Sequence, residues 1–478
     1  MTFTLEEVLE ATGGRLLCGK REVVFPAIST DSRRITEGAL FVALKGRRFD
    51  GHQFVVEALA KRAGGVLIEE GKAEEVQRAA QSERPVILVK DTLRALGDMA
   101  RHRRQKFGIS VVGLTGSNGK TTTKELIAAC LETSFPVLKT MGNFNNLIGL
   151  PLTLLQLTGK EKVAVLEMGM NVPGEIGRLT EIAAPDVGLI TNIQRAHLEG
   201  LGSLERIQQE KGDLFLKMRQ DGTIIVNLDD LRVVELGRKF PGRKITIGIE
   251  NRADIMAKEI RTEGREGTSF RLFHEGGEAE VRLPLIGRHF VYHGLFAIAT
   301  AKLFGIGTEE ILKALETFQP APMRMEVLSL EGGVNLINDA YNANPDSMEM
   351  ALRTLSEVKG EGRAIAVLGD MLELGDFTVE AHRQLGRKAA LFSIDLLLVM
   401  GEEAALVVES ALQAGMAPDR AKRVSSPSEA ARLIKAFARQ GDWILVKGSR
   451  GMAMERVVEI LRREKEEKDA LSSALPPS

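Results

Sequence analysis

Short apolar runs alternate with helix-length stretches of mixed polarity along most of the chain. One series of runs occupies residues 109–112, 163–168, 187–192 and 223–227, and a second occupies 334–339, 363–368, 396–400 and 443–447. Apolar runs of strand length are typical of parallel strands buried on both faces, and the stretches between them are typical of covering helices. The pattern therefore predicts two doubly wound α/β units, each built on a parallel sheet.

The pattern changes at three places. Runs over 254–285 are shorter and alternate between apolar and polar, which predicts antiparallel strands added to the first sheet, and a helix is expected over about 294–304. Prolines cluster in Thr317-Phe-Gln-Pro-Ala-Pro-Met323, which indicates a linker. Residues 1–88 alternate short strands and helices, which predicts a smaller α/β unit.

A chain of 478 residues is too long for one core, and its length favours three domains. We expect a smaller N-terminal α/β domain at 1–88, a central parallel-sheet domain with a phosphate loop at 89–318, and a Rossmann-like domain at 319–465. Residues 466–478 end in Leu-Pro-Pro-Ser after a run of charge, and we expect a disordered tail there.

Charge and cysteine usage exclude several classes of protein. The chain has 64 Lys and Arg against 65 Asp and Glu, whereas a general nucleic-acid binder carries a basic excess. Two tyrosines and one tryptophan also make a base-stacking platform implausible. Two distant cysteines, an acidic N-terminus and the lack of an apolar run of about 18 residues predict a cytoplasmic protein that does not enter a membrane.

A basic cluster, Arg101-His-Arg-Arg-Gln-Lys106, ends the helix expected over 91–106. Because a helix C-terminus carries partial negative charge, we interpret this cluster as a solvated helix end rather than as an anion site.

A glycine-rich turn, Gly113-Leu-Thr-Gly-Ser-Asn-Gly-Lys-Thr121, lies between the first run and the next expected helix. A strand, such a turn and a helix N-terminus together place backbone N–H groups where a polyphosphate can bind. Lys120 is expected to reach the β and γ phosphates and Thr121 to ligate Mg²⁺. Leu114 replaces the first glycine of the usual phosphate-loop pattern, and an ordinary glycine-rich turn is the alternative. The residues expected to hold ATP here are Thr115, Gly116, Ser117, Asn118, Gly119, Lys120, Thr121 and Thr122.

Polar residues follow the next strands of the central sheet. Glu167, Asn192 and Asn227 fall at carboxyl ends of strands, where ligands of parallel sheets bind. His197 follows the same strand as Asn192, although a single histidine is more often structural. Lys211 lies in a helix-patterned stretch, and an ammonium beside divalent ions is unfavourable, so an unmodified Lys211 predicts a phosphate contact or a surface lysine.

Two N-terminal segments, Ser29-Thr-Asp-Ser-Arg-Arg34 and Phe49-Asp-Gly-His52, combine hydroxyl, carboxylate and basic groups with turns. They suit a sugar diphosphate or a nucleobase edge, and a solvated loop explains them equally well.

The stretches Thr115-Gly-Ser-Asn-Gly-Lys-Thr121, Thr191-Asn-Ile-Gln-Arg-Ala-His-Leu-Glu199 and Glu210-Lys-Gly212 resemble the ATP site of the Mur ligase family and the related folylpolyglutamate synthetases. The resemblance implies that Lys211 carries a carbamate derived from CO₂. It also implies two Mg²⁺ ions, one held by Thr121 and Glu167 and one by His197 and carbamylated Lys211. The catalytic residues that it implies are Lys120, His197, Lys211 and Arg324.

Further stretches narrow the resemblance, including Asn338-Asp-Ala-Tyr-Asn-Ala-Asn-Pro-Asp-Ser-Met348 and Gly142-Asn-Phe-Asn-Asn-Leu-Ile-Gly-Leu-Pro151. They are similar to the branch of the family that adds D-alanyl-D-alanine to a UDP-N-acetylmuramoyl-tripeptide through an acyl phosphate. This implies a monomer of cytoplasmic peptidoglycan precursor synthesis with small-molecule partners only. Expected further ATP contacts are Asn227, His293, Arg324 and Asp339, and expected substrate contacts are Asp31, Ser32, Arg33, Asp50, Asn143, Asn145, Asn146, Tyr341, Asn342 and Asn344.

The chain departs from the family pattern at three points. Met323-Arg324 replaces the usual Gly-Arg, Phe290 and His293 replace asparagines, and Gln194-Arg195 stand where a glycine is usual. Another amide ligase of the family, adding a single amino acid to the muramoyl chain or glutamate to folate, is one alternative function. A nucleotide-dependent switch is the other.

Overall fold

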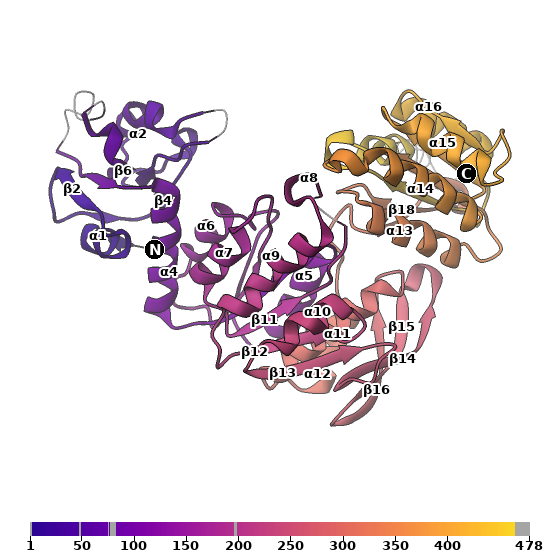
Figure 1. Cartoon of the computed structure of the whole chain (residues 1–478), viewed down its shortest axis with the longest axis horizontal. Helices are drawn as coiled ribbons and strands as arrows, with labels where there is room; N and C mark the ends of the chain where they lie inside the picture. Colours follow the sequence, from indigo (N-terminus) through magenta and orange to yellow (C-terminus); the bar gives the residue numbers. More distant parts are fainter. Residues whose placement is uncertain (1, 47–48, 75, 77–82, 196–197, 464–478) are drawn as a thin grey trace, which may run out of the picture.

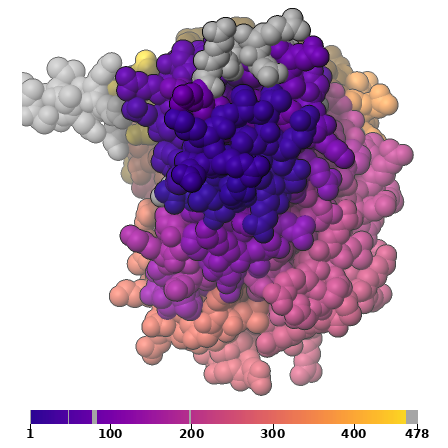
Figure 2. All heavy atoms as spheres, turned by 90° about the vertical axis from the view of Figure 1, so that its left-hand side faces the viewer, coloured from indigo at the N-terminus to yellow at the C-terminus, as the bar shows by residue number. Residues whose placement is uncertain are grey.

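The computed structural model describes residues 2–46, 49–74, 76, 83–195 and 198–463. The chain forms three α/β units, with the N-terminal and C-terminal units on opposite sides of the upper edge of the middle one (Figure 1). Seen from the N-terminal side, the indigo N-terminal unit sits on the purple and magenta middle unit (Figure 2). Within the described ranges, no helix combines the length and apolarity needed to cross a membrane. The expected disordered tail lies outside the described residues.

The N-terminal unit is built on a five-stranded sheet with strand order β2-β7-β6-β5-β4. Strands β4 to β7 are parallel and β2 runs antiparallel to β7. Its elements are β1 Phe3–Thr4, α1 Leu5–Thr12, β2 Arg15–Cys18, β3 Val24–Phe25, β4 Ile28–Ser29, η1 Ser32–Arg34, β5 Leu40–Val42, η2 Gly51–Phe54, α2 Val55–Ala60, β6 Gly65–Glu69, η3 Glu70–Lys72 and β7 Val86–Val89.

Helix α4, Thr92–Phe107, joins the N-terminal unit to the middle one, and its cap is Asp91, whose carboxylate accepts from the N–H of Arg94 at 2.8 Å. The interpretation of its basic end as solvated is wrong for Arg103, which is 3% exposed. The Arg103 guanidinium donates to the carbonyl of Thr2 at 3.0 Å and lies 4.5 Å from the centre of the Phe3 ring. The arginine is buried because it satisfies carbonyls where the two units meet.

The middle unit has a nine-stranded sheet with order β16-β15-β14-β13-β12-β11-β8-β10-β9. Strands β8 to β14 are parallel, and β15 and β16 continue the sheet antiparallel. The antiparallel addition predicted over 254–285 is therefore confirmed for β15 and β16, whereas β14 still pairs parallel with β13. Its elements are β8 Ser110–Thr115, α5 Lys120–Glu132, β9 Val137–Lys139, α6 Gly149–Leu154, β10 Val163–Glu167, α7 Glu175–Ala183, β11 Val187–Ile190, α8 Leu198–Leu201, α9 Leu204–Lys217, β12 Thr223–Asn227, α10 Leu231–Arg238, β13 Arg243–Gly248, β14 Ile255–Thr262, η4 Gly264–Glu266, β15 Thr268–His274, β16 Gly277–Leu283, α11 His289–Leu303 and α12 Thr308–Glu316.

Alternate residues of the central strand β8 enter different cores. Val112 and Leu114 pack with α5 and α11, whereas Val111 packs with α4, α6, α7 and α9 on the other face. The sheet is therefore covered on both faces, as continuous apolar strands predict.

The C-terminal unit has a six-stranded sheet with order β17-β18-β22-β19-β20-β21, parallel except for β17. The four strands expected from apolar runs are confirmed as β18, β19, β20 and β22. Its elements are β17 Glu326–Ser329, η5 Glu331–Gly333, β18 Asn335–Asp339, α13 Pro345–Val358, β19 Ala364–Gly369, η6 Gly375–Phe377, α14 Thr378–Leu391, β20 Leu396–Met400, α15 Ala404–Gln413, β21 Ala421–Arg423, α16 Pro427–Phe437, β22 Trp443–Lys447 and η7 Arg450–Met452.

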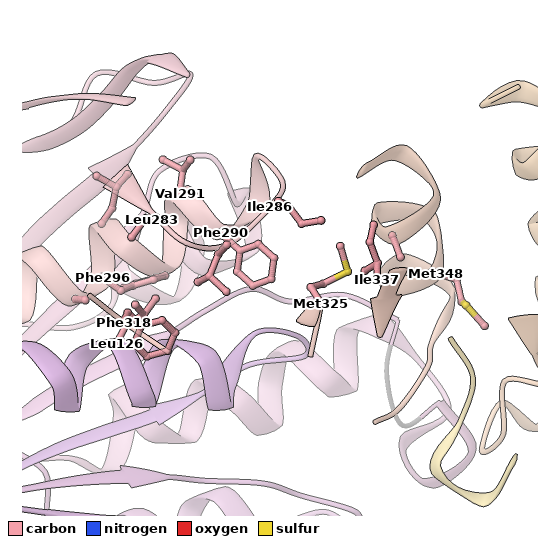
Figure 3. Close-up of a cluster of buried hydrophobic side chains, with 14 of the residues drawn as sticks. Leu126, Leu283, Ile286, Phe290, Val291, Phe296, Phe318, Met325, Ile337 and Met348 are labelled. Atoms are coloured by element: carbon pink, nitrogen blue, oxygen red, sulfur yellow. The ribbon is translucent and has the colours of Figure 1, made fainter. Parts of the chain in front are cut away.

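One apolar cluster continues from the middle unit into the C-terminal unit. Met325 lies between Phe290 of the middle unit and Ile337 of the C-terminal unit (Figure 3), and all three are buried. Met348 and Leu352 of α13 belong to the same cluster, so this packing holds one face of α13 close to the middle unit.

Candidate active site

A cleft of about 870 Å³ lies between the middle and C-terminal units. Its middle-unit wall is formed by the phosphate loop and by the ends of β10, β11 and β12, and its other wall is formed by the turns after β18 and β22. In an α/β sheet the carboxyl ends of parallel strands are the usual place for a ligand, so both sheets direct their binding edges into this cleft.

The phosphate loop connects β8 to α5 and depends on two glycines. Gly116 has φ 151° and a Cβ there would lie 1.8 Å from the hydroxyl of Thr191, while Gly119 has φ 76° and a Cβ there would lie 2.0 Å from the His293 ring. Both positions therefore exclude a side chain. Lys120 begins α5, and its ammonium donates to the carbonyls of Gly116 at 2.8 Å and Ser117 at 3.3 Å. The loop thus curls around the lysine that the sequence assigns to phosphate.

The end of β11 fixes the shape of the loop. The N–H of Asn118 donates to the side-chain oxygen of Asn192 at 2.9 Å, and the hydroxyl of Thr191 donates to the Asn118 carbonyl at 2.6 Å. Ser117 Oγ and the backbone N–H and carbonyl of Gln194 form two further bonds of 2.9 Å each. The sequence predicted a ligand role for Asn192 and nothing for Gln194.

Thr121 and Glu167 meet beside the loop. Glu167 ends β10, is 2% exposed, and its Oε2 accepts from Thr121 Oγ1 at 2.9 Å, while Oε1 accepts from Asn145 Nδ2 at 2.8 Å. A hydroxyl and a carboxylate at this distance can share one hard cation. In the part of the chain that the structure describes, no three His, Cys, Asp or Glu side chains gather as a metal cluster.

Lys211 is buried in the middle of α9 and is 1% exposed. Its ammonium donates to the carbonyl of Gly116 at 3.0 Å, and the neighbouring carboxylate of Glu210 is occupied by the backbone N–H groups of Gly174 and Ile176. Burial, and next the charge of Lys120, hold the pKa of Lys211 well below its usual value. The structure thus brings Lys211 to the phosphate loop. His197, which the sequence assigns beside it, lies outside the described residues.

Asn227 and His293, two of the further residues expected to contact ATP, lie on the side of the cleft near the end of β12. Asn227 ends β12 and accepts from the N–H of Asp229 at 3.0 Å. His293 lies below Gly119, and its Nδ1 is 2.9 Å from the hydroxyl of Thr123. Burial lowers the pKa of His293 to about 4, so the ring is neutral at pH 7. His293 supports the loop from beneath while also lining the cleft.

The C-terminal wall begins with the linker. The guanidinium of Arg324 lies 3.9 Å from the centre of the Tyr341 ring, and both line the cleft. Its neighbours Met323 and Met325 have φ 61° and 51°, so two side chains occupy a backbone region that favours glycine. The positive φ of Met323 thus falls at the position where the family usually has a glycine.

Lys447 organises the turn after β18. It is 3% exposed, pairs with the carboxylate of Asp339 and donates to the carbonyl of Asn342 at 3.0 Å. Asp339 also accepts from the N–H of Met325 at 3.2 Å. Asn342 is exposed at the cleft, whereas the amide of Asn344 contacts the phosphate loop. The sequence did not assign a role to Lys447, although its place at the carboxyl end of a predicted strand is the kind of position where one is expected.

Asn143, Asn145 and Asn146 belong to the loop before α6. All three line the cleft, with Asn143 exposed. Asn146 also holds the start of α6, since its Oδ1 accepts from the N–H of Gly149 at 2.8 Å. The loop therefore faces the cleft opposite the C-terminal unit.

The expected N-terminal substrate contacts lie away from this cleft. Asp31, Ser32 and Arg33 follow β4, and Asp50 follows the adjacent parallel strand β5. Arg33 binds Asp31 through Nε and Nη2 at 2.9 Å each, which lowers the pKa of that carboxyl to about 2. Ser32 is buried and donates to Glu57.

Asp50 is part of a fixed pair with His52. The N–H of Glu69 donates to His52 Nε2 at 3.0 Å, so Nδ1 carries the proton and donates to Asp50 at 2.6 Å. This pair fixes the turn after β5 at the same sheet edge as Asp31.

Known proteins match this chain over nearly its whole length. The Mur ligase family catalytic domain matches residues 25–104, the Mur ligase middle domain matches 114–301, and the Mur ligase glutamate ligase domain matches 323–450. The UDP-N-acetylmuramoyl-tripeptide–D-alanyl-D-alanine ligase of Bacillus subtilis is 38% identical over 96% of this chain and 98% of its own length. The enzyme of the same name from Escherichia coli is 36% identical over 97% of this chain and 99% of its own length.

Solved structures give the same result. A crystal structure of MurF from Acinetobacter baumannii matches with a TM-score of 0.87 at 33% identity, covering 96% of this chain and 99% of its own. MurF ligase from Thermotoga maritima in complex with ADP matches with a TM-score of 0.81 at 29% identity, and the match covers 92% of this chain and 98% of that one.

A phosphate-loop unit whose cleft is completed by a second α/β unit is typical of a multidomain, nucleotide-dependent enzyme. The chain belongs to the Mur ligase family. Within that family, the relatives and solved structures named above, to which it is similar over nearly its whole length, are MurF ligases.

Proposed function

We propose that this chain uses ATP to join D-alanyl-D-alanine to a UDP-N-acetylmuramoyl-tripeptide in peptidoglycan precursor synthesis. The observation that carries the proposal is the cleft itself, which has a phosphate loop on one wall and cationic and amide side chains of another unit on the other. The nearly full-length similarity to ligases of that name supports this acceptor and this amine over the other substrates of the family.

The reaction has two steps. A terminal carboxylate oxygen of the tripeptide attacks the γ-phosphorus of ATP, and ADP leaves. The amine nitrogen of D-alanyl-D-alanine then attacks the carbonyl carbon of the acyl phosphate and loses a proton, and orthophosphate leaves as the C–N bond forms. Phosphorylation is needed because a free carboxylate is a poor electrophile.

The chain's cations stabilise the transferred phosphoryl group. In our proposal Lys120 exchanges its bonds to Gly116 and Ser117 for phosphate oxygens, and Arg324 approaches from the opposite wall. Preorganised charges of this kind contribute roughly 3 kcal/mol each to stabilisation of a transition state. Because Arg324 lies beyond the linker, the complete site requires the C-terminal unit.

We propose that Thr121 and Glu167 hold one Mg²⁺ ion. Their oxygens are hard donors that already meet beside the phosphate loop. Two such ions, when bound, neutralise charge on the nucleotide and the acceptor carboxylate. The second ion is assigned to His197 and a carbamate on Lys211.

The surroundings of Lys211 suit a carbamate better than an ammonium. Its nitrogen is buried close to the cationic Lys120, and its hydrogen bond goes to a carbonyl rather than to a carboxylate. A neutral amine at Lys211 can attack the carbon of CO₂ and release one proton, which places a carbamate anion beside Lys120. The neutral amine and the nearby charge of Lys120 therefore both favour a carbamate at Lys211.

The N-terminal unit is proposed to bind the UDP part of the acceptor, through the turns that carry Asp31, Ser32, Arg33 and Asp50. We further propose that the chain acts as a monomer in the cytoplasm, since its substrates are small molecules and one chain supplies both walls of the cleft.

A coupled assay tests the function. Purified protein with MgATP, D-alanyl-D-alanine and a UDP-N-acetylmuramoyl-tripeptide is expected to release orthophosphate, and mass spectrometry should detect the pentapeptide product. Diaminopimelate and lysine forms of the tripeptide are compared, and glutamate or alanine replaces the dipeptide as control. Orthophosphate release that does not depend on the dipeptide would reject the proposal.

A further inference from the structure

The first turn of α13 contacts the catalytic wall of the middle unit at two points. The side-chain Nδ2 of Asn344 donates to the Oδ1 of Asn118, in the phosphate loop, at 2.7 Å. Two residues further on, the Oδ2 of Asp346 accepts from the backbone N–H of Arg195, just after β11, at 2.8 Å. Two residues at one helix end thus reach two different segments across the boundary between the units.

The helix end that makes these contacts is rigid. Asn344 is the cap of α13: its Oδ1 accepts from the N–H of Ser347 at 2.9 Å and its own N–H donates to Ser347 Oγ at 3.0 Å. Pro345 fixes the first helical residue. Since the cap uses Oδ1, the Nδ2 group of Asn344 is directed outward, toward the loop.

The two segments that receive these contacts are joined to each other. The Nδ2 of Asn118 donates to the Oε1 of Gln194 at 2.7 Å, and Ser117 forms the two bonds to the Gln194 backbone described above. Asn344 and Asp346 therefore hold opposite ends of one hydrogen-bonded unit, which comprises the phosphate loop and the turn after β11.

The middle of α13 is held close to the same wall. Gly287 of the middle unit has φ 120°, and a Cβ at this position would lie 2.8 Å from the hydroxyl of Thr354 in α13. The helix therefore approaches the middle unit along its length, and small changes in its position are transmitted to Asn118 and Arg195.

We propose that Asn344 and Asp346 are positioning residues, which hold the phosphate loop and the turn after β11 in register with the C-terminal wall for phosphoryl transfer. The proposal rests on the ligase function proposed above. The loop N–H groups and Lys120, which are expected to hold the phosphates of ATP, and the expected contacts Arg324 and Asp339 all stay in place when Asn344 or Asp346 is replaced. Loss of the contacts is therefore expected to lower kcat while leaving nucleotide binding nearly unchanged.

The test uses variants that keep the helix cap. Asn344→Ser retains a capping hydroxyl but is too short to reach Asn118, and Asp346→Ala removes the acceptor for Arg195 while Asp346→Asn retains it. For Asn344→Ser and Asp346→Ala we expect kcat of dipeptide-dependent orthophosphate release to fall by about 10-fold or more. The Kd for ADP should stay within about threefold of wild type, and Asp346→Asn should restore most of the rate.

A matched control separates capping from positioning. Ser426 caps α16, at the far side of the C-terminal unit, by accepting from the N–H of Glu429 at 3.2 Å. Ser426→Ala is expected to lower the melting temperature without changing kcat, whereas Asn344→Ser should lower kcat without changing the melting temperature.

Hydrogen exchange provides a readout that needs no turnover. In Asn344→Ser the amides of residues 116–122 are expected to exchange faster than in wild type. Unchanged exchange there, a kcat within about twofold of wild type, or a parallel loss of kcat and ADP affinity would overturn the positioning role. A wild-type enzyme that makes no product would instead reject the ligase function, and the exchange measurement would still decide the positioning role.

Discussion

Lys211 and Lys120 place two amines on the same carbonyl of the phosphate loop. Both donate to Gly116, at 3.0 Å and 2.8 Å, and Lys211 is almost completely buried. Two ammonium groups that donate to one carbonyl repel each other, and burial of Lys211 reduces the screening of that repulsion by water. Burial of Lys211, and next the charge of Lys120, lower the pKa of Lys211, which increases the fraction of neutral amine available to react with CO₂ at pH 7.

Lys211→Ala tests the carbamate. We expect the rate of ligation to fall by about 100-fold or more, because the proposed metal ligand and its negative charge would be lost. Acetate should restore part of the rate by occupying the space left by the side chain. Lys217→Ala, on the same helix but pairing with Asp213, is the control and should retain the wild-type rate. Full activity of Lys211→Ala without acetate would contradict the carbamate.

His293 makes stability depend on pH. Its pKa is 6.5 in the reference state and about 4 in the folded chain, because burial disfavours the charged ring. The unfolded chain therefore binds more protons between these values, and the contribution of the neutral ring to stability, complete above pH 6.5, is lost as the pH falls toward 4. The loss amounts to at most about 3 kcal/mol.

The measurement compares wild type with His293→Gln in urea titrations from pH 7 to pH 4. The variant should be the less stable protein at pH 7, since it loses a packed ring, and the difference should shrink as the pH falls. Parallel stability profiles for the two proteins would show that His293 does not titrate as described.

Residues within one motif could be assigned from the sequence, whereas contacts between distant segments could not. The phosphate loop can be recognised from the sequence because its glycines, lysine and threonine lie within one short stretch. Asp346 and Arg195 are separated by 151 positions, and their contact depends on how α13 docks. Asn344 was expected to contact the substrate, and its bond to Asn118 forms only when both units are in place.

At the scale of elements, α4 is a structural joint between the first two units. Its Arg103 binds the carbonyls of Thr2 in the N-terminal unit and Leu157 in the middle one, and lies between the rings of Phe3 and Phe107. A buried guanidinium with these partners resists any rotation of one unit against the other, because rotation would leave carbonyls unpaired.

Arg103→Met should destabilise the chain by about 3 kcal/mol, through loss of charge-assisted hydrogen bonds and ring contacts. The free energy of unfolding from urea titrations measures the effect. Arg101→Met on the exposed side of the same helix is the control and should change stability by less than about 0.5 kcal/mol. Equal stability of the two variants would contradict a joint at Arg103.

Strands that are buried on both faces were predictable, and edge strands were less so. Every strand expected from a continuous apolar run is present. Strand β13, Arg243–Gly248, escaped prediction because its first residues are charged and exposed. Strand β21, Ala421–Arg423, is a short edge strand with two exposed basic residues. Such strands form because a neighbouring strand offers hydrogen bonds, and their own side chains carry little pattern.

At the scale of the whole molecule, binding of the UDP group and the ligation reaction are assigned to different units. The expected UDP contacts belong to the N-terminal sheet, and the cleft belongs to the other two units. Substitutions in the phosphate loop should therefore affect the reaction and spare recognition of the nucleotide sugar.

Lys120→Ala should abolish orthophosphate release while the Kd for the UDP-N-acetylmuramoyl-tripeptide stays within about threefold of wild type. Isothermal titration calorimetry without ATP measures that Kd. Loss of binding together with activity would contradict the division of roles between the units.

The two walls of the cleft are synthesised at different times. Lys120 leaves the ribosome more than 200 residues before Arg324, a delay of roughly 10 to 40 s at ordinary rates of translation. During that interval a nascent chain carries a nucleotide loop but lacks the opposite half of the cleft. Truncated or stalled copies of the protein are therefore expected to sequester ATP without turning it over, and competence begins only when the last unit has folded.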